Sequence, residues 1–321
     1  MNKTVLVTGA NGFIGKHICR QALKEGLTVY AGVRHESNVS IISDLGVEVV
    51  RLSYLDIKKL TKELQKLGKM DYLIHNAGVV KAVNLSGFIE GNVNVTQNLI
   101  EVVSLTSCLK GQFVYVSSLA ARGPAPTSKD QPISDYGESK LMAERLLIKS
   151  NLPWTIIRPT AVYGPGDFIF LDLVRMLNNR FAISLGSRNP KLTFIHGEDL
   201  ARLILSVKDI SHEVFYGVDG KHYTQKELIA YVSNSLEKTP LLWLHLPAYI
   251  VKYISRLINF FYKVILQRPW MYNPRKISEI LADDWTVTIP EYQKKLEFQF
   301  KYDLSTGFKQ TIEDYKSQKL I

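Results

Sequence analysis

Cysteine is scarce in this chain of 321 residues, which contains only Cys19 and Cys108. The two lie far apart, each in an apolar, helix-like run, so their spacing fits neither a disulfide framework nor a metal site. Two buried free thiols are the simplest interpretation, and they suit a reducing compartment. We therefore expect no bound metal and a cytoplasmic location.

The N-terminus lacks the long apolar run of a secretory signal peptide, because MNKTVLVTGANG enters a short strand-like run and reaches glycine at residue 9. Fixed-period repeats and low-complexity segments are also missing. The composition is that of an ordinary globular protein, 46% hydrophobic and 22% charged. Its length suits one large domain, or two that share an interface.

Charge is unbalanced, with a formal net value of +10. A basic chain can bind nucleic acid, an anionic membrane or an anionic small ligand. Lys and Arg are spread along the sequence, and the dense pairs Lys58-Lys59 and Lys294-Lys295 fall in helix-like segments typical of solvated faces. We therefore expect no nucleic-acid partner and favour a phosphate-bearing cofactor.

The first half alternates short apolar runs with amphipathic ones. Strands are expected at Thr4–Val7, Thr28–Val33, Val47–Leu52, Tyr72–Ile74, Gln112–Ser117 and Trp154–Ile157, and helices at Phe13–Glu25, Ile57–Leu67, Val93–Ser107 and Tyr136–Lys149. This alternation predicts an α/β fold, a Rossmann-type doubly wound parallel sheet. It weakens after Pro159, so we predict a dinucleotide-binding domain over residues 1–160. Residues 161–321 would form a smaller substrate lobe, with segments returning to the sheet.

A glycine-rich turn joins the first expected strand to the first expected helix. Gly9 permits the tight turn, Gly12 lets the backbone approach a pyrophosphate at the helix N-terminus, and Gly15 lets helix and strand pack closely. The flanking strand and helix are the context that this motif requires. The residues expected to bind a dinucleotide are Gly9, Asn11, Gly12, Phe13, Ile14 and Gly15.

The end of the second expected strand carries a cation where NAD-binding folds usually place an acid for the ribose 2′-hydroxyl. Arg34 stands there, and the first acid after it is Glu36. A guanidinium can hold a 2′-phosphate through paired hydrogen bonds. The sequence thus favours NADP over NAD, the alternative being that Arg34 is merely an exposed residue at a strand end.

Tyr136 and Lys140 are four residues apart in a helix-like segment and so share one helix face. A free phenol has a pKa of about 10, and a nearby ammonium would lower it, so that the phenol could exchange protons. Upstream, an expected strand ends in Ser117-Ser118, where a hydroxyl could bond a substrate oxygen as it gains charge. We predict a catalytic set of Ser118, Tyr136 and Lys140.

Together these segments resemble the extended short-chain dehydrogenases/reductases, also called the NAD-dependent epimerase/dehydratase superfamily, over nearly the whole chain. The matching segments are TGANGFIG, DYLIHNAG (71–78), NVNVTQNL (92–99), VSSLA, RPTAVYGP (158–165), FIHGEDLA (194–201) and Trp285–Gly307. The resemblance implies that Ser118 is the substrate serine and that Asn92 supports a proton relay. It also places further residues beside the cofactor: His75, Ala77, Gly78, Asn92, Ser117, Pro159 and Val162.

Three departures from the family pattern narrow the chemistry. Leu52-Ser53 replaces the Gly-Asp whose acid holds adenine, leaving Ser53 as a weak substitute. Leu192 stands where sugar-nucleotide epimerases carry an arginine for the diphosphate, and Leu119-Ala120 stands where dehydratases carry Asp-Glu. The remaining branch is similar to dihydroflavonol reductases and 3β-hydroxysteroid dehydrogenases, which act on apolar ketones or alcohols.

The sequence therefore predicts an NADP-dependent oxidoreductase acting on a small apolar ketone, aldehyde or alcohol. Two alternatives stay open: an NDP-sugar epimerase or dehydratase with bound NAD, and a non-enzymatic dinucleotide-binding protein. The intact Ser, Tyr and Lys set argues against the second of these.

Residues 244–266 form a strongly apolar helix-like run, interrupted by Lys252, Arg256 and Lys263. These cations, with Ser255 and Asn259, fall on one narrow stripe, which predicts an amphipathic helix with a wide apolar face. We expect this face to roof a substrate pocket or to pack in a homodimer. The alternative is peripheral contact of residues 246–266 with a membrane surface.

Overall fold

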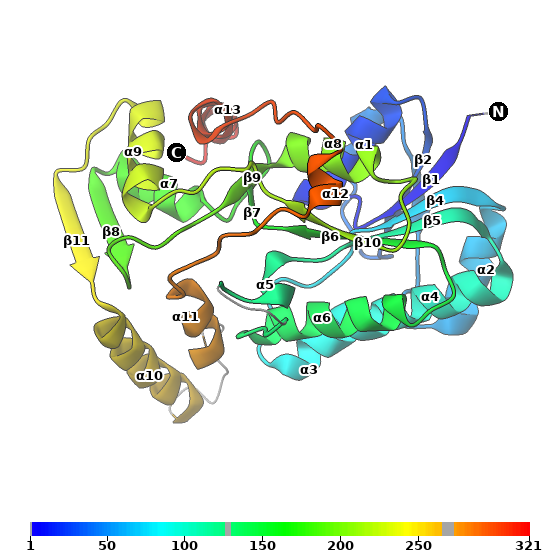
Figure 1. The fold of residues 1–321 in the computed structure, drawn as a ribbon, viewed down its shortest axis with the longest axis horizontal. Coiled ribbons are helices and arrows are strands. Elements are labelled where there is room, and N and C mark those ends of the chain that lie inside the picture. Colours follow the sequence, from blue (N-terminus) through cyan, green and yellow to red (C-terminus); the bar gives the residue numbers. More distant parts are fainter. Residues whose placement is uncertain (1, 126–129, 265–272) are drawn as a thin grey trace.

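The computed structural model describes residues 2–125, 130–264 and 273–321. At its centre is a seven-stranded sheet in the order β10-β6-β5-β4-β1-β2-β3, in which neighbouring strands pair in parallel (Figure 1). The strands are β1 (Thr4–Thr8), β2 (Thr28–Val33), β3 (Glu48–Arg51), β4 (Met70–His75), β5 (Leu109–Val116), β6 (Trp154–Pro159) and β10 (Glu213–Gly217). The order reverses between β1 and β4, which confirms the predicted Rossmann-type fold and puts the ligand crevice at the carboxyl ends of these strands.

Helices cover both faces of the sheet (Figure 1). One face carries α1 (Phe13–Lys24) and α8 (Gly197–Ser206), and the other carries α2 (Ile57–Lys66), α4 (Val95–Thr106) and α6 (Asp135–Ile148). Alternate residues of β1 supply both layers, because successive side chains of a strand point to opposite faces. Val5 and Val7 pack in the α1/α8 layer, whereas Leu6 packs in the α2/α4/α6 layer.

The second half adds β10 to the sheet and α8 to one of its faces, and much of the rest forms a smaller lobe. β10 returns to pair with β6, with Phe215 opposite Ile157. The lobe has its own apolar cluster, which includes Tyr163, Val232 and Phe308. Its elements are β7 (Ala161–Tyr163), α7 (Leu171–Asn178), β8 (Phe181–Leu185), β9 (Phe194–His196), α9 (Gln225–Leu236), β11 (Leu242–Leu246), α10 (Ala248–Val264), α11 (Pro274–Ile280) and α13 (Leu304–Ser317).

Short elements complete the described chain, and most of them border the carboxyl edge of the sheet. They are η1 (Ser40–Leu45), α3 (Leu85–Phe88), η2 (Ile89–Asn94), α5 (Leu119–Arg122) and α12 (Glu291–Lys294). Over the three described ranges, no helix is both long enough and apolar enough to traverse a lipid bilayer.

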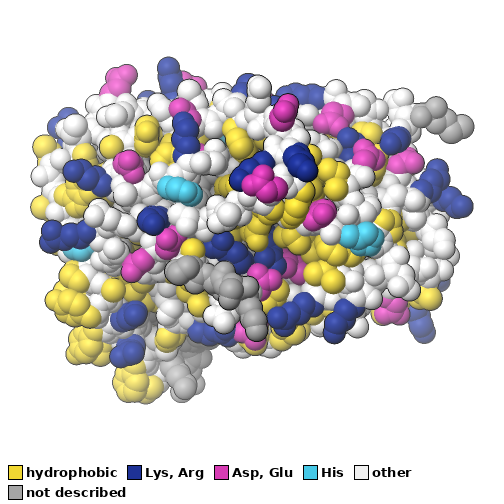
Figure 2. All heavy atoms as spheres, in the orientation of Figure 1, with side chains coloured by type: hydrophobic (Ala, Val, Ile, Leu, Met, Phe, Trp, Pro, Cys, Tyr) yellow, Lys and Arg dark blue, Asp and Glu magenta, His cyan; other side chains and the backbone are white. Residues whose placement is uncertain are grey.

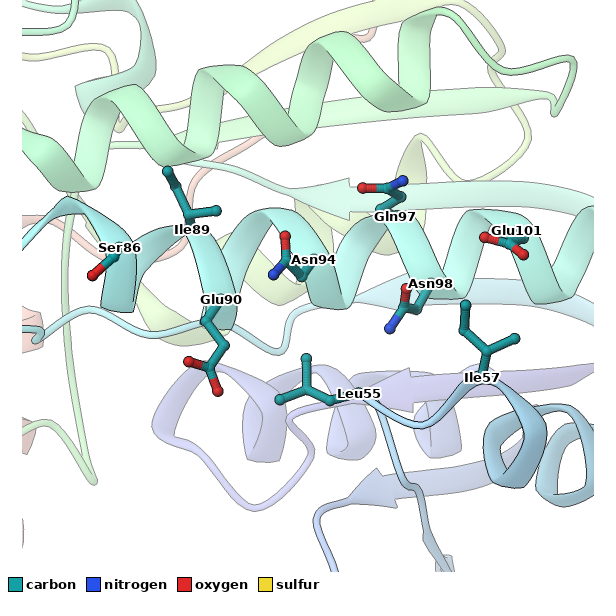
Figure 3. Close-up of a pocket in the computed structure, with 9 residues that line it drawn as sticks. All are labelled: Leu55, Ile57, Ser86, Ile89, Glu90, Asn94, Gln97, Asn98 and Glu101. Carbon is teal, nitrogen blue, oxygen red and sulfur yellow. The ribbon is translucent and has the colours of Figure 1, made fainter.

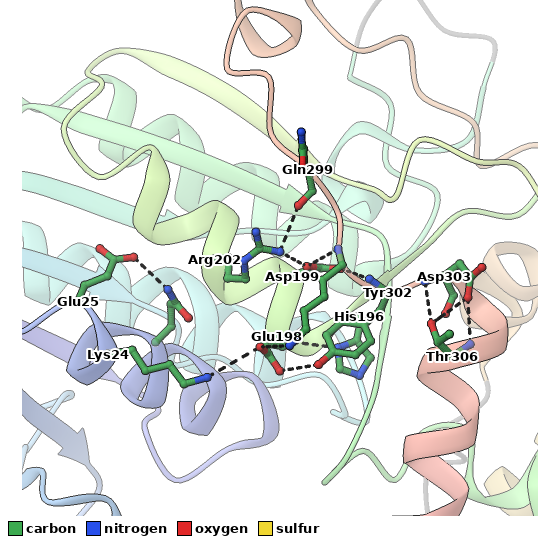
Figure 4. A network of polar contacts seen from close by, with 12 residues as sticks. Lys24, Glu25, His196, Glu198, Asp199, Arg202, Gln299, Tyr302, Asp303 and Thr306 are labelled. Atoms are coloured by element: carbon green, nitrogen blue, oxygen red, sulfur yellow. Dashed lines mark hydrogen bonds and ion pairs between the residues drawn. The ribbon is translucent and has the colours of Figure 1, made fainter.

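The C-terminal segment is anchored to the first turn of α8 (Figure 4). Asp199, with only 1% of its side chain exposed, pairs with Arg202 at 2.6 Å. Its carboxylate also accepts hydrogen bonds from the backbone amides of Lys301 and Tyr302, at 2.9 Å each. The acid of the FIHGEDLA segment therefore serves to hold the chain end against the helix that packs on α1.

Candidate functional site

The glycine turn after β1 has the geometry that close approach to a ligand requires. Gly9 adopts a φ of +66°, and a Cβ there would lie 2.8 Å from the Cα of Ala77. A Cβ on Gly15 would overlap the carbonyl oxygen of Gly9. Gly12 is the exposed N-cap of α1, and neither a capping side chain nor an acidic residue occupies the first turn of that helix. These free amides and the helix dipole fit the pyrophosphate of a dinucleotide, with Phe13 and Ile14 supplying the first helical amides.

The loop after β2 lies against the glycine turn. Thr8 pairs with Gly32 in the sheet, and the Asn11 side chain donates a 3.2 Å bond to the carbonyl oxygen of Asn38. Arg34 is exposed at this edge. Arg51, at the end of β3, bonds the backbone carbonyl of Arg34 at 3.3 Å and so steadies the loop. The structure thus brings Asn11 and Arg34 to the same edge as the glycines.

Ser53, the predicted substitute for an adenine-binding acid, is hydrogen-bonded to an acid that the sequence did not reveal. Its hydroxyl donates to Glu63 of α2 at 2.9 Å, and its amide donates to the same carboxylate at 2.7 Å. His35 also contacts this carboxylate, at 3.1 Å. Burial works to raise the pKa of Glu63, but the bonds from Ser53 and His35 outweigh it and lower that pKa. The carboxylate of Glu63 therefore lies beside the predicted adenine region, and it comes from helix α2 and not from the end of β3.

His75 is fully buried, in contrast to its predicted place beside the cofactor. Its ring nitrogens lie 2.7 Å from the hydroxyl of Thr8 and 3.0 Å from that of Thr96. Burial lowers the pKa of His75 to about 3, and the charge of Lys140 adds to this effect. Thr8 in turn accepts a 3.1 Å bond from the amide of Ala77. His75 thus fixes the strand ends that present Ala77 and Gly78, and does not itself face the crevice.

Tyr136 and Ser118 come together at the carboxyl edge of β5. Ser118 is the N-cap of α5, where its hydroxyl accepts a 3.1 Å bond from the amide of Ala120. The same hydroxyl is near enough to the phenol of Tyr136 to act on it, and it lowers the pKa of that phenol. The ring of Tyr136 lies 5.9 Å from that of Phe88, centroid to centroid. The structure therefore assembles the predicted pair of hydroxyls beside an apolar wall.

The predicted lowering of the Tyr136 pKa by Lys140 is wrong in this structure. Burial raises the pKa of Tyr136 to about 12, against a smaller lowering by the nearby Ser118 hydroxyl and with a further rise from the charge of Glu279. The reason is that the Lys140 ammonium is directed elsewhere. It donates a 2.8 Å bond to the carbonyl oxygen of Val116 and lies 4.6 Å from the ring centre of Tyr115.

Lys140 nevertheless borders the crevice. A Cβ on Gly78 would lie 3.4 Å from its Nζ atom and 3.0 Å from the Oδ1 atom of Asn92. Burial lowers the pKa of Lys140 to about 8, opposed by the charge of Glu144. A side chain at position 78 would crowd both of these groups, so Gly78, Lys140 and Asn92 lie together on one side of the site.

Asn92 lies in η2, a stretch of π-helix that interrupts the helix leading into α4. Its side chain accepts a 2.7 Å bond from the amide of Val79 and donates a 2.9 Å bond to the hydroxyl of Ser139. The widened turn is a device often found at functional sites. Here it turns Asn92 between the loop after Gly78 and the helix that carries Tyr136.

A buried ion-pair network beneath α6 was not anticipated. Arg158 bonds the carboxylate of Glu144 at 2.6 and 3.0 Å and that of Asp130 at 2.8 and 2.9 Å. Glu144 has 1% of its side chain exposed. The Ser117 hydroxyl also donates to Glu144, so this hydroxyl points into the protein and not into the crevice as predicted. No local pattern signals this network, because Arg158, Glu144 and Asp130 belong to different segments of the chain.

Pro159 and Val162 flank the crossing from the sheet into the lobe. Pro159 ends β6 opposite Gly217, and Val162 lies in β7 with 7% exposure. Between them the hydroxyl of Thr160 accepts or donates a 2.7 Å bond with that of Thr193. Both predicted residues therefore lie at the strand-to-lobe junction, where the resemblance places the edge of the cofactor site.

The helix α11 closes the other side of the site. Arg275 bonds Asp135 at 2.5 Å and Glu138 at 2.7 Å, so α11 is fixed to the first turn of α6, where Tyr136 lies. Glu279 of α11 bonds Lys276 through one carboxylate oxygen, and the other oxygen is buried without a hydrogen-bond partner. Because α11 is held against the turn that carries Tyr136, the charge of Glu279 acts on the phenol and raises its pKa.

A separate hollow of about 640 Å³ lies on the outer side of α4 (Figure 3). It is lined by Glu90, Asn94, Gln97 and Glu101 along one helix face, with Leu55 and Ile57 opposite. None of the predicted catalytic or cofactor residues lines it. The reactive groups described above thus lie outside this hollow.

A family model of the NAD-dependent epimerase/dehydratase family matches residues 5–213. The chain belongs to this family. Its membership confirms the resemblance inferred from the motifs and the expectation of an NAD(P)-dependent enzyme. The match includes the glycine turn, Ser118, Tyr136 and Lys140.

Similar proteins span nearly the whole chain. A ceramide reductase of Caulobacter vibrioides is 27% identical over 98% of this chain and 94% of its own length. A UDP-glucose 4-epimerase of Vibrio cholerae is 26% identical over 98% of this chain and 96% of its own. The crystal structure of a UDP-glucose 4-epimerase of Thermus thermophilus in complex with NAD superposes with a TM-score of 0.72 at 19% identity, covering 98% of this chain and 99% of that one. The last likeness shows the shared fold.

Proposed function

We propose that the protein is an NADP-dependent oxidoreductase that reduces a ketone or aldehyde of an apolar small molecule, or oxidises the corresponding alcohol. The observation that carries this proposal is the pair of neighbouring hydroxyls of Ser118 and Tyr136, with Lys140 beside Gly78, at the sheet edge that carries the glycine turn. A nicotinamide cofactor, when bound, supplies or accepts the hydride, and the protein supplies position and protons.

Each member of the set has a distinct role. Ser118 orients the substrate oxygen by hydrogen bonding and links it to the phenol. Tyr136, with its pKa raised to about 12 mainly by burial, is protonated at neutral pH and is therefore suited to donate a proton in the reductive direction. Lys140 places its ammonium, a hydrogen-bond donor, at the Gly78 side of the crevice, where a cofactor ribose would be bound. The amides at the start of α1 hold the pyrophosphate.

NADP is favoured by Arg34, which is exposed beside the glycine turn. Its guanidinium can engage the oxygens of a 2′-phosphate, and the loop that carries it is braced by Arg51 and tied to Asn11. Glu63 would favour NAD instead, because a carboxylate in this region can accept hydrogen bonds from an unphosphorylated ribose. Activity measured with NADPH and with NADH decides whether Arg34 or Glu63 sets the choice of cofactor.

An apolar substrate is supported by what surrounds the positions of the family's sugar-nucleotide groups. Leu192 packs against the apolar cluster of the lobe, and Lys191, the neighbouring cation, pairs with Asp284 at 3.6 Å. The loop that follows Gly78 exposes Val80 and Val83. The full-length similarity to a ceramide reductase agrees with this substrate class.

An NDP-sugar epimerase is the second candidate, because the similarity to the Vibrio cholerae enzyme also spans the whole chain. Such an enzyme would retain NAD through gel filtration and would interconvert UDP-hexoses. Purified protein that emerges with stoichiometric NAD and converts UDP-glucose would establish this alternative.

The test of the proposal is a panel of apolar ketones and alcohols followed at the nicotinamide absorbance with NADPH and NADH in parallel. Tyr136→Phe should lower kcat about 10²- to 10⁴-fold, because the proton donor is lost. The matched control is Tyr292→Phe, which removes a remote phenol bonded to the backbone of Val214. Unchanged turnover in Tyr136→Phe would exclude the proposed chemistry.

A further inference from the structure

The segment 241–264, comprising β11 and α10, carries many apolar side chains on the molecular surface. We call these exposed side chains the apolar ridge. Leu241 is 76% exposed, Tyr249 72% and Phe260 64%. Figure 2 shows hydrophobic atoms gathered at the corner of the molecule where Figure 1 places α10. Single exposed apolar residues are normal in soluble proteins, but a contiguous group of this kind marks an interaction surface.

The orientation of α10 differs from the expectation that its apolar face roofs a pocket. The face turned inward includes Ser255, which is 4% exposed and bonds the backbone of Lys252. The face turned outward carries Tyr253, Leu257 and Phe260. The expected roof is therefore wrong for these side chains, because they contact solvent in the folded chain.

The charges on this segment all have one sign. Residues 241–264 contain no Asp or Glu. Lys252 and Arg256 are exposed and four residues apart, so they share one side of the helix, next to the outward apolar face. Trp243, Tyr249 and Tyr253 add amphipathic rings of the kind enriched at membrane–water interfaces. The ridge combines aromatic and aliphatic groups with cations and lacks any anion.

We propose that segment 241–264 docks the protein on the surface of an anionic lipid bilayer, with α10 lying in the interface plane. The apolar side chains enter the acyl boundary, while Lys252 and Arg256 stay at headgroup level opposite lipid phosphates. The 17 residues of α10 suit this arrangement, because α10 is too short to cross a bilayer.

A second copy of the chain fits this surface less well. A two-fold contact would set each ridge against itself, since both subunits present the same patch. Lys252 and Arg256 would then face the same segment of the second copy, which offers no carboxylate to pair with them. An anionic bilayer supplies the missing negative charge.

Docking would place the bilayer close to the candidate site. α10 packs against α11, and α11 is joined to the first turn of α6 through Arg275 (Figure 1). An apolar substrate dissolved in the membrane would thus have a short path to Tyr136. The docking itself is independent of the reaction proposed above, and its test uses no substrate.

The experiment is co-sedimentation of the full-length protein with vesicles of phosphatidylcholine alone and with phosphatidylcholine containing phosphatidylglycerol. Binding should require the anionic lipid and weaken at high salt. The double variant Lys252→Gln/Arg256→Gln should bind about 30-fold more weakly, from the attraction of each basic residue to an anionic surface. The matched control Lys58→Gln/Lys62→Gln, on the exposed face of α2, should bind like the wild type. Tyr253→Ser/Phe260→Ser should abolish binding.

Circular dichroism melts of each variant establish that the fold is retained, and light scattering reports the oligomeric state. Binding lost in both ridge variants and kept in the control supports the docking surface. Absence of binding to anionic vesicles, or binding unchanged in the ridge variants, overturns it. A dimer that Tyr253→Ser/Phe260→Ser converts to a monomer would identify a second copy as the occupant and also overturns it.

Discussion

The ammonium of Lys140 is bonded to the carbonyl oxygen of Val116 at 2.8 Å, so it is held against the end of β5. This bond, together with the ring of Tyr115, keeps the cation within the protein beside Gly78. Lys140 therefore acts on the crevice as a positioned donor and does not depress the pKa of Tyr136. Burial raises the pKa of Tyr136 above its ordinary value and lowers the pKa of Lys140 below its own.

The pH dependence of ketone reduction should carry the signature of Lys140. Burial lowers its pKa to about 8, so the ammonium is present below that pH and is lost as the pH rises through it. We expect kcat/KM to fall above about pH 8, because the charged donor is lost. Lys140→Arg should remove this fall, since a guanidinium remains charged. Lys149→Arg, at the exposed end of the same helix, is the control. A fall that persists unchanged in Lys140→Arg would assign it to another group.

Glu279 should tune Tyr136 in the oxidative direction. Its charge raises the pKa of Tyr136, in addition to the larger effect of burial. In Glu279→Gln that pKa should decrease, so the phenolate fraction at a given alkaline pH increases. Alcohol oxidation should then become several-fold faster between about pH 8 and 11, the range below the pKa of the phenol. Glu291→Gln, on α12, should leave the profile unchanged, and an upward displacement in Glu279→Gln would contradict the assignment.

Cofactor choice should respond to Arg34. Arg34→Ala should raise KM for NADPH about tenfold or more, because a charge-assisted contact with the 2′-phosphate is lost. KM for NADH should hardly change. Arg20→Ala, an exposed cation on α1, is the control for net charge. Glu63→Gln completes the comparison: a large rise in KM for NADH alone would make Glu63 the ribose ligand and NAD the cofactor.

The ion pair beneath α6 should matter for stability. Arg158→Met leaves the carboxylate of Glu144, 1% exposed, without its counter-ion. Breaking such a buried pair costs about 3–5 kcal/mol. Asp130→Asn removes a partner that is 34% exposed and should cost about 1 kcal/mol or less. Urea unfolding measures both values, and equal losses would show that burial of Glu144 is not the deciding factor.

The sequence predicted those parts of the molecule that depend on local patterns. β1, β2 and β6 follow from short apolar runs, and the glycine turn follows from steric needs that only glycine meets, as at Gly9. Tyr136 and Ser118 were found because a helix period and a strand end place them. Each of these inferences needs only neighbouring residues.

Other features depend on how distant elements approach each other. Glu63 reaches Ser53 only because α2 folds back along β3, and Arg158 meets Glu144 only because β6 runs beneath α6. The direction of the wide apolar face of α10 was also misjudged, since periodicity shows that a face exists and not which side is covered.

Asp199 has a consequence for the order in which the protein can mature. Its carboxylate is satisfied by amides at positions 301 and 302, and α8, which bears it, packs on α1. A nascent chain in which residues 301 and 302 have not yet emerged from the ribosome would leave the carboxylate of Asp199 without these two donors, next to the pyrophosphate helix. The packing of α1 and α8 is therefore completed by a segment that is synthesised well after both helices.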